Sequence, residues 1–580
     1  MKRRNRFLFV LLCALPLFAL MSCGGLGEEE KQGPVIVTNI AETPLVSLPG
    51  ATKVYDKDAT PAALTVTATV SAGDLTFQWY SNTALSTSDG TEIPEETTDT
   101  YTPSTGTEGS FYYYCVVTNT DESKEIPTTT VASNVAWIRV IDAANPLTGN
   151  VIMVNPGAKY QWVRGFGGMM NGWHNSPPMS QKDVDTAFGP DGLGLNIFRV
   201  MIYPYMDDLA NGKEEAPPSE PDTHSFYYSR IRRAKSYGVD ILASPWTPPA
   251  EWKASGSRVG GAKLLEEHWA DYAQHLKSYI ARMASNNAPI DFISIQNEPD
   301  IGVSYDGCDW TGEEMRDFIK AYARVIAPAN GPVKIMPGES YQFRDAFFNP
   351  IYNDPVAMDA VDVIAGHWYG GGRNRHPRAV NAGKEVWMTE HLLNTASNYN
   401  LDSQWQSVWP MIEELHDAMV FDYNAFVWWY IKRFYGLIGD NEYGTQNGQP
   451  LFRGYAISHY AKYAANKNRI DALPLGSAAS SISVASVAPS SNVYLTAYES
   501  DTEITLVLFN RGATAINALN IDLPVAVESA SLVITQGSSN TQVETAGQAM
   551  QTGTITLSAD KKTGTFDVPA SSIISVRFTR

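Results

Sequence analysis

Eight short apolar runs, each followed by polar or helix-like sequence, constrain the fold of this chain more than any other feature. Helical patterns lie between most of them, for example at 264–283 and 311–327. Strands that alternate with helices over about 300 residues predict a parallel (β/α)₈ barrel, or TIM barrel, spanning 163–465. The eight expected strands are 165–168, 195–202, 240–246, 292–298, 333–337, 363–369, 386–390 and 425–431.

The sequence on both sides of this region is typical of β structure. From 41 to 142, alternating runs separated by turn residues predict an Ig-like β-sandwich. Trp79, Cys115 and Tyr113 have the spacing of an immunoglobulin core, without a second cysteine for the disulfide. We expect this domain to be a spacer; glycan binding is the alternative. A side β-sandwich is expected from 151–162 together with 466–580.

The N-terminus is typical of an export signal. Four basic residues precede an apolar stretch that is too short for a membrane span. The sequence that ends at Cys23 resembles a bacterial lipobox, so we expect a signal peptide at 1–22, lipidation of Cys23 and a tether at 23–40. The predicted location is the outer membrane, with the protein exposed on the cell surface. A plain secretory signal cleaved elsewhere is the alternative.

Charge and cysteine content exclude several classes of partner. The formal net charge of −19 argues against nucleic acid. Two cysteines besides Cys13 and Cys23 remain, Cys115 and Cys308, in different predicted domains, so a disulfide is not expected. Neither has the spacing of a zinc site. We therefore expect no metal and no cofactor, and a monomer.

Two glutamates end expected strands and are the candidate catalytic residues. Glu298 closes the fourth strand of the predicted barrel and Glu390 the seventh. The carboxyl ends of barrel strands meet on one face, which carries the chemistry. One such glutamate alone is more simply a surface charge or a structural salt bridge. Two of them near tryptophans indicate cleavage of a glycosidic bond, in which one carboxyl protonates the leaving oxygen and the other acts from the opposite side.

Other polar and aromatic residues near the expected strand ends are candidate substrate contacts. Asn297 can bind the 2-hydroxyl of a sugar. Three more residues, His367, Tyr369 and Arg199, can tune the ionisation of the two glutamates. Flat faces for sugar rings are offered by Trp173, Trp246, Trp368 and Trp429.

These motifs together resemble glycoside hydrolase family 30. The resemblance runs from about 151 to the C-terminus and includes the side sandwich. It implies a retaining mechanism, with Glu298 as acid/base and Glu390 as nucleophile, and carboxyl groups about 5–5.5 Å apart. The motifs that carry it are 164–169, 244–250, 293–300 and 387–391.

Within the family, three segments resemble subfamily 8, the glucuronoxylan endo-xylanases: 308–313, 426–436 and 453–458. The resemblance implies that Arg433 and Tyr435 hold the 4-O-methylglucuronate branch of xylan, with Tyr369 and Trp429 nearby. A guanidinium group can bind a sugar carboxylate through two parallel hydrogen bonds. The alternative is that Arg433 pairs internally with Asp440 or Glu442.

Two segments depart from the subfamily pattern, the Gly- and Arg-rich loop 370–376 and the long segment 438–450. Either could relax the requirement for glucuronate. The expected function is a retaining endo-β-1,4-xylanase that acts on glucuronoxylan. A glucanase, a β-glucosidase-like enzyme or a uronate-independent xylanase is an alternative within the family. A surface glycan-binding lipoprotein is the alternative outside enzymes.

Overall fold

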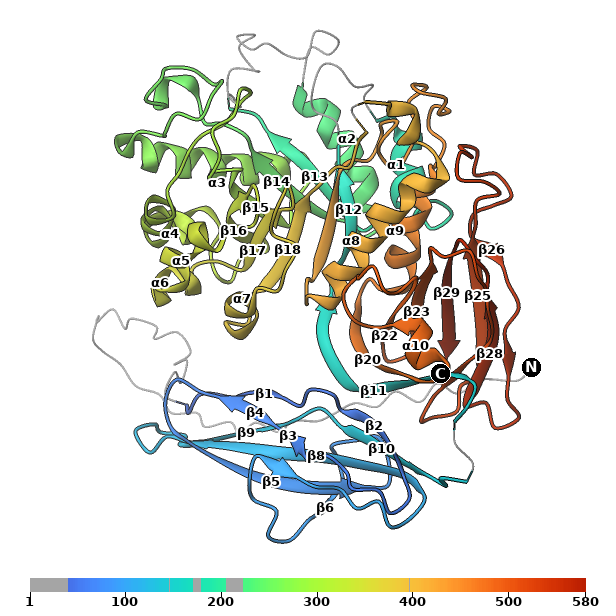
Figure 1. Ribbon diagram of the computed structural model, residues 1–580. Helices are drawn as coiled ribbons and strands as arrows, with labels where there is room; N and C mark the ends of the chain where they lie inside the picture. Colours follow the sequence, from blue (N-terminus) through green and yellow to red (C-terminus); the bar gives the residue numbers. More distant parts are fainter. Residues whose placement is uncertain (1–39, 145–146, 171–178, 205–222, 396) are drawn as a thin grey trace, which may run out of the picture.

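The computed structural model describes residues 40–144, 147–170, 179–204, 223–395 and 397–580. They form a barrel, a large sheet region beside it and a separate set of N-terminal sheets below both (Figure 1). Within these residues no helix has the length and apolar character needed to cross a membrane. The predicted signal peptide, the tether and the lipidated Cys23 lie outside the described residues.

The predicted barrel is confirmed. Eight strands pair in parallel and in sequence order, and the last closes on the first. The fifth strand is longer than expected, because it continues past residue 337 to Ser340. The strands are β12 (Gly165–Met169), β13 (Ile197–Ile202), β14 (Asp240–Pro245), β15 (Phe292–Asn297), β16 (Lys334–Ser340), β17 (Val363–His367), β18 (Glu385–Glu390) and β19 (Ala425–Tyr430).

Side-chain alternation along the strands divides the barrel interior into an apolar floor and a polar mouth. Residues two apart on a strand share a face. Ile197, Leu242 and Ala365 belong to one buried apolar cluster. Two positions further along the same strands stand Arg199, Ser244 and His367, all fully buried. The carboxyl end of the barrel is therefore polar because the alternation continues after the apolar layer ends.

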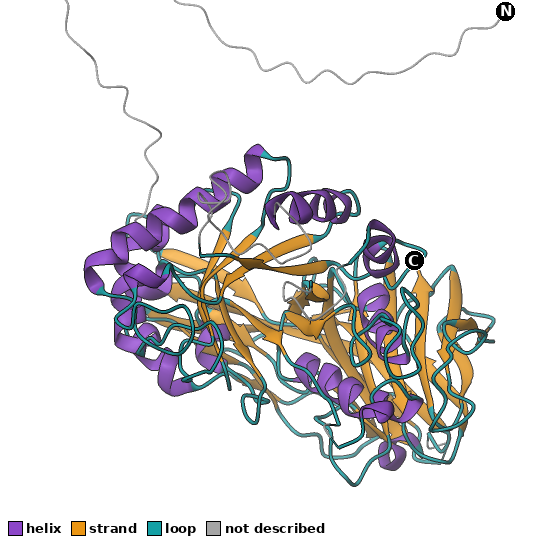
Figure 2. Ribbon diagram, turned by 90° about the horizontal axis from the view of Figure 1, so that it is seen from above, coloured by secondary structure: helices purple, strands orange, loops and turns teal. Residues whose placement is uncertain are grey.

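Helices cover the outside of the barrel (Figure 2). Helix α4 shows why they form: Thr311 caps it and exchanges hydrogen bonds with Glu314, and Met315, Phe318 and Ile319 bury one face. Burying each large apolar side chain contributes about 1.5–3 kcal/mol. The helices are α1 (Gln181–Phe188), α2 (Thr223–Lys235), α3 (Trp269–Ser285), α4 (Gly312–Ile326), α5 (Asp345–Tyr352), α6 (Pro355–Asp359), α7 (Pro377–Asn381), α8 (Val408–Val420) and α9 (Phe452–Tyr463).

The side region is one extended sheet that combines a strand from before the barrel with the C-terminal strands. Helices α8 and α9 lie between this sheet and the barrel. His459 of α9 contacts the hydroxyls of Ser575 and Thr535, both at 2.8 Å. The strands are β11 (Asn150–Val163), β20 (Lys467–Gly476), β21 (Ile482–Ser483), β22 (Val493–Glu499), β23 (Glu503–Asn510), β24 (Ile516–Asp522), β25 (Ser529–Thr535), β26 (Gln551–Thr552), β27 (Thr556–Leu557), β28 (Thr563–Val568) and β29 (Ser572–Thr579), with the short helix α10 (Ala478–Ser481).

The N-terminal region contains a six-stranded sheet and two small two-stranded sheets around a core of its own. Trp79 and Cys115 are register partners and both are fully buried. Cys115 and Cys308 are free thiols. The strands are β1 (Leu45–Ser47), β2 (Thr52–Asp56), β3 (Leu64–Thr65), β4 (Thr67–Thr69), β5 (Asp74–Asn82), β6 (Thr91–Glu92), β7 (Thr100–Tyr101), β8 (Gly109–Thr120), β9 (Thr128–Ala132) and β10 (Ala136–Ile141).

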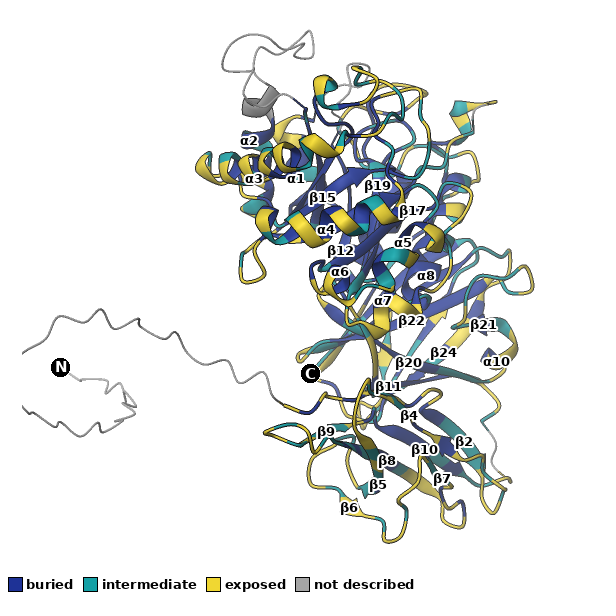
Figure 3. Cartoon of the chain, turned by 90° about the vertical axis from the view of Figure 1, so that its left-hand side faces the viewer, coloured by how far each residue is buried: buried dark blue, intermediate teal, exposed yellow. Residues whose placement is uncertain are grey.

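A second apolar cluster fastens the N-terminal sheets to the side sheet. Along β10, Ile138 faces the N-terminal core, whereas Trp137 packs in a cluster with Met153 of β11 and Leu473 of β20. Arg139 also pairs with Asp522 of the side sheet. Figure 3 shows the close approach of β2 and β10 to β11 and β20. The N-terminal sheets are thus packed against the rest of the molecule.

Candidate active site

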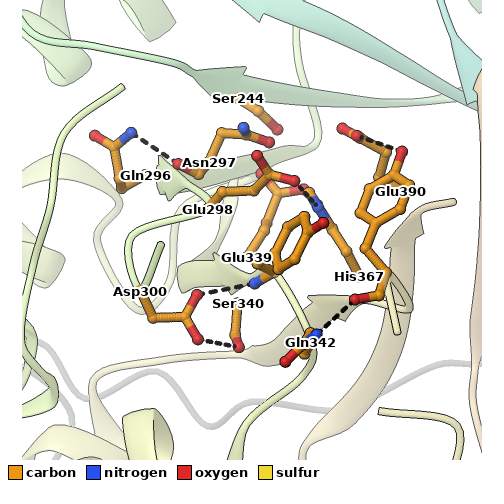
Figure 4. A network of polar contacts seen from close by, with 12 residues as sticks. Ser244, Gln296, Asn297, Glu298, Asp300, Glu339, Ser340, Gln342, His367 and Glu390 are labelled. Carbon is orange, nitrogen blue, oxygen red and sulfur yellow. Dashed lines mark hydrogen bonds and ion pairs between the residues drawn. The ribbon is translucent and has the colours of Figure 1, made fainter. Parts of the chain in front are cut away.

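The two strand-end glutamates meet in the mouth of the barrel (Figure 4). A carboxylate oxygen of Glu298 lies within 4.8 Å of one of Glu390, and a ring nitrogen of His367 lies within the same distance of both. Each glutamate is only 5% exposed. Two carboxyl groups that are far apart in the sequence therefore flank a space the size of one bond-cleavage site.

Glu298 accepts two hydrogen bonds and has an unusual backbone. Its carboxylate accepts a hydrogen bond from the Tyr305 hydroxyl at 2.5 Å and lies 3.0 Å from Nδ1 of His367. Its φ of +47° is in the left-handed region, which a glutamate seldom adopts. The backbone N–H of Glu298 donates to the carbonyl of Glu339 at 3.0 Å. The turn that follows β15 thus aims this carboxyl into the barrel mouth.

Glu390 is held by a cation and a hydroxyl. Nη1 of Arg199 donates to one carboxylate oxygen at 2.5 Å, and the Tyr369 hydroxyl donates to the other at 2.9 Å. Burial raises the pKa of Glu390 above its ordinary value, and Glu298 adds to this, while His367 and Arg199 oppose it. The two donors favour the anionic form in this geometry, because both hydrogen bonds are made to the charged carboxylate.

Arg199, at the centre of β13, connects the parts of the site. Its guanidinium donates to Oδ1 of Asn297 at 2.6 Å and lies 3.0 Å from Glu339. It also donates to the Ser244 hydroxyl and lies 4.8 Å from the ring centre of Trp246. Arg199 is fully buried, so its charge acts at close range and with little screening by water. The predicted residues Arg199 and Asn297 thus lie beside the two glutamates.

His367 is protonated at neutral pH. Burial alone would lower its pKa, but Glu390, Glu298 and Glu339 together raise it from 6.5 to about 9. Glu298, His367 and Glu390, whose ligand atoms lie within 4.8 Å of one another, therefore form a charge network.

Glu339 is a site residue that the sequence analysis missed. It is fully buried below His367 and beside Arg199. Burial would raise its pKa, but Arg199, His367 and Ser244 lower it to about 2. The expected fifth strand ended at residue 337, two residues before Glu339, whereas β16 continues to Ser340. An acidic residue two places beyond the expected strand end was the available signal.

The cavity above the two glutamates has a volume of about 500 Å³ and mainly aromatic walls. Trp246 and Trp429, both predicted to contact sugars, lie with their ring centres 6.0 Å apart. Aromatic faces of this kind suit pyranose rings. Four lining residues were not predicted from the sequence: Tyr305, Tyr341, Leu392 and Tyr430.

Arg433 and Tyr435 line the same cavity as the glutamates. The guanidinium of Arg433 also lies 3.3 Å from Asp440, whose side chain is fully buried. Arg433 thus lines the cavity and also has the internal partner that was the alternative, while its contact with glucuronate stays a prediction. Lys432 points elsewhere and pairs with Asp183 at 2.7 Å.

Two loops support the cavity wall, one after β15 with Asp300 and one after β16 with Gln342. Gln342 donates to the carbonyl of Tyr369 at 2.8 Å, and Asp300 accepts from the Ser340 hydroxyl at 2.8 Å. Tyr341 stacks on Tyr369 with ring centres 5.3 Å apart. These contacts fix Tyr369, which donates to Glu390.

Two expectations about this region are corrected. Trp368 lies on the outward face of β17's end, where its indole donates to the Tyr423 hydroxyl at 3.1 Å, so it does not face the cavity. The arginines of loop 370–376 turn away as well, because Arg373 pairs with Asp417 and Arg375 pairs with Asp422. Trp173 lies outside the described residues.

Comparisons with known proteins agree with this geometry. Residues 165–399 match the glycosyl hydrolase family 30 TIM-barrel domain. Glucuronoxylanase XynC of Bacillus subtilis (strain 168) is 31% identical over 418 residues, which cover 69% of this chain and 87% of the relative.

Solved structures are similar too. The family 30 subfamily 8 xylanase Xyn30A from Clostridium acetobutylicum superposes with a TM-score of 0.61 at 28% identity, over 74% of this chain and 99% of the other. A GH30 endoxylanase from Clostridium papyrosolvens C71 gives a TM-score of 0.59 at 28% identity, over 74% and 100%. The family match and the extent of these similarities show that the chain belongs to glycoside hydrolase family 30.

Proposed function

We propose that this protein is a retaining endo-β-1,4-xylanase that hydrolyses glucuronoxylan and recognises a (4-O-methyl)glucuronate branch. One observation carries the proposal: Glu298 and Glu390 approach within 4.8 Å in a cavity that Arg433 and Tyr435 also line. Retaining glycosidases have carboxyl groups about 5–5.5 Å apart, whereas inverting ones need about 6.5–9.5 Å to admit a water molecule.

The contacts support a two-step reaction. Glu390, held as an anion by Arg199 and Tyr369, attacks the anomeric carbon while Glu298 gives its proton to the leaving oxygen. Glu298 then takes a proton from the water that cleaves the glycosyl–enzyme ester, which restores both carboxyl groups. Asn297 is positioned by Arg199 to bind the sugar 2-hydroxyl. The reaction calls for no cofactor and no metal.

The charge of Arg433 and its position in the cavity wall support recognition of glucuronate. Arg433 is 23% exposed at its side chain, and its guanidinium lies over the rings of Phe434 and Tyr435. A half-buried guanidinium beside an aromatic wall is suited to a sugar carboxylate. The relatives named above include a glucuronoxylanase. We further propose a monomer anchored by lipid to the outer membrane and exposed at the cell surface, with the N-terminal sheets as spacer.

The Arg433→Ala variant tests the uronate pocket. We expect kcat/KM to fall about 10- to 100-fold on glucuronoxylan, because a hydrogen-bonded charge pair is lost. Activity on unbranched xylan should change far less. The measurement is digestion of both polymers, with mass spectrometry of the products, each of which should carry one glucuronate at a fixed place.

Arg375→Ala is the matched control, because this arginine pairs with Asp422 away from the cavity. It should leave both activities unchanged. An equal loss on the two polymers in Arg433→Ala, or no loss, would rule out the uronate pocket and favour a uronate-independent xylanase, a glucanase or a β-glucosidase-like activity.

The Glu390→Gln variant separates an enzyme from a surface glycan-binding protein. We expect cleavage to fall by at least about 10³-fold, because the nucleophile is lost, while binding to xylan persists. Reducing-end release and affinity electrophoresis on the same sample measure the two effects. Wild-type protein that binds xylan but releases no reducing ends would establish the binding protein instead.

A further inference from the structure

Tyr305 is the second hydrogen-bond donor to Glu298. It follows Glu298 in the loop between β15 and α4, and its hydroxyl donates to the carboxylate at 2.5 Å. Its ring lines the cavity and the residue is 42% exposed. Burial and the negative charge of Glu298 raise the pKa of Tyr305. The phenol therefore stays protonated and acts as a donor whenever Glu298 is charged.

A buried lysine secures the loop that carries Tyr305. Lys253 is 2% exposed, and its ammonium group donates to three backbone carbonyls. The acceptors are Arg258 at 3.1 Å, Gly260 at 2.9 Å and Gly307 at 2.5 Å. An ammonium has three N–H donors, so these carbonyls satisfy all of them. Two acceptors lie in the loop after β14 and one lies beside Tyr305, so Lys253 joins two loops.

Further contacts connect the loop after β14 with the loop that carries Tyr305. The N–H of Gly260 donates to the carbonyl of Tyr305 at 2.8 Å. Arg258 pairs with Asp306 at 3.2 Å, and Gly260 has a φ of +88°, which a residue with a side chain would adopt only under strain. The position of the Tyr305 hydroxyl is therefore set from the loop after β14, not only from its own loop.

The groups that face Glu298 divide into those that favour its charge and those that oppose it. His367 of β17 and Tyr305 donate toward the carboxylate. Glu390 of β18 brings a second carboxyl group within 4.8 Å of it. From the end of β16, Glu339 acts through His367, and the phenol of Tyr341 also lies in the cavity wall. Arg199 of β13 contacts Glu390, not Glu298.

We propose that Tyr305 is a positioning residue that sets the proton affinity of Glu298, and that Lys253 holds it there by joining the two loops. The inference rests on the proposed function, in which Glu298 is the acid/base. A hydrogen bond to a carboxylate favours the anion. Tyr305 thereby holds the Glu298 carboxylate ready to act as the base of the second step.

The Tyr305→Phe variant tests the donor directly. The alkaline limb of the kcat/KM profile reports the acid of the free enzyme. Removal of the hydroxyl should move this limb to higher pH by about one unit, because the neutral form of Glu298 is then favoured. Tyr341→Phe is the matched control, because it alters another phenol of the same cavity. The alkaline limb of its kcat/KM profile should stay at the wild-type pH, even if kcat/KM itself changes. An unmoved limb in Tyr305→Phe overturns the proposal.

The Lys253→Met variant tests the role of the joined loops. It should move the same limb in the same direction, by less than Tyr305→Phe does. Lys467→Met provides the control, because Lys467 is a buried lysine of the side sheet that pairs with Glu503. It should lower Tm without moving the limb. A Lys253→Met protein that loses stability but keeps the wild-type limb shows that the lysine is only structural and overturns this part.

A measurement without substrate separates this inference from the proposed function. In protein labelled with carbon-13 glutamate, the Glu298 carboxyl signal is assigned by its loss in Glu298→Gln. Its titration should move to higher pH in Tyr305→Phe. If the wild type cleaves no β-linked xylan, the proposed function fails, and the carboxyl titration still decides whether Tyr305 controls Glu298. An unchanged titration overturns the inference even in an active enzyme.

Discussion

Arg199 and Glu339 form a buried ion pair beneath the catalytic glutamates, with their atoms 3.0 Å apart. Glu339 holds the positive charges of Arg199 and His367 close to the two carboxyl groups. Those two cations offset two of the three negative charges that ionised Glu298, Glu339 and Glu390 bring into one barrel mouth. At the residue scale the site is therefore a network in which each charge has an opposite neighbour, and in which a change to one alters the others.

The Glu339→Gln variant should lower the pKa of His367 from about 9 by about 1–3 units, because one of its anionic neighbours is lost. The pKa of His367 also makes the stability of the fold depend on pH. The folded pKa lies above the ordinary 6.5, so the stabilising contribution is complete below pH 6.5 and is lost as pH rises through about 9. In the variant this loss should begin at lower pH. Imidazole NMR and Tm from pH 6 to 10 measure both effects.

Glu414→Gln is the control for this change, since Glu414 contacts another buried histidine, His391, at 2.8 Å. It should leave the titration of His367 in place. A His367 that still titrates near pH 9 without Glu339 would contradict the network.

At the scale of elements, strand ends and the loops after them place most charged groups of the site, whereas Arg199 lies within β13. Glu298 follows β15, Glu390 ends β18, and Arg433 lies in the loop after β19. The helices between strands set the spacing of these ends. Helix α4 begins directly after the loop that carries Tyr305, so its start limits how far that loop can move.

The Thr311→Ala variant should lower the free energy of unfolding by about 1 kcal/mol, because the cap of α4 is lost. Thr311 accepts from the Glu314 N–H at 3.1 Å, and its own N–H donates to the Glu314 carboxylate at 2.8 Å. Urea unfolding followed by circular dichroism measures the change. Thr311→Ser keeps the hydroxyl and should retain most of the stability; an equal loss in both variants would argue against the cap.

At the scale of the whole molecule, three bodies share two buried interfaces. The side sheet packs on α8 and α9 of the barrel, and the N-terminal sheets pack on β11 and β20 through the cluster around Trp137. Because β11 enters the side sheet and ends directly before β12, it couples the sheet region to the first barrel strand. The three bodies are thus expected to move together.

The Trp137→Ala variant should weaken the docking of the N-terminal sheets by about 3–5 kcal/mol, since a large buried aromatic is removed. We expect faster proteolysis in the link near 142–149 and little change in activity on short soluble substrates. Limited proteolysis with mass spectrometry measures this. Ile126→Ala alters an exposed residue of the same region and should not change the cleavage rate; equal sensitivity of the two variants would speak against the interface.

Much of the barrel could be predicted from the sequence, because strand and helix periods are local properties. The two glutamates were found for the same reason: each closes an apolar run, and parallel strands bring their carboxyl ends to one face. Glu339 was missed because strand ends are poorly marked when Pro337 and Gly338 interrupt the apolar pattern.

The sequence by itself determined the barrel, the position of the two strand-end glutamates on it and the aromatic character of the cleft. Only the tertiary structure decided which neighbours each charged group has. The Tyr305 hydroxyl on Glu298, the Lys253 link between loops and the Asp440 partner of Arg433 depend on how loops pack. The physical reason is that periodicity fixes the face on which a side chain lies, whereas contacts between loops depend on the whole set of packed elements.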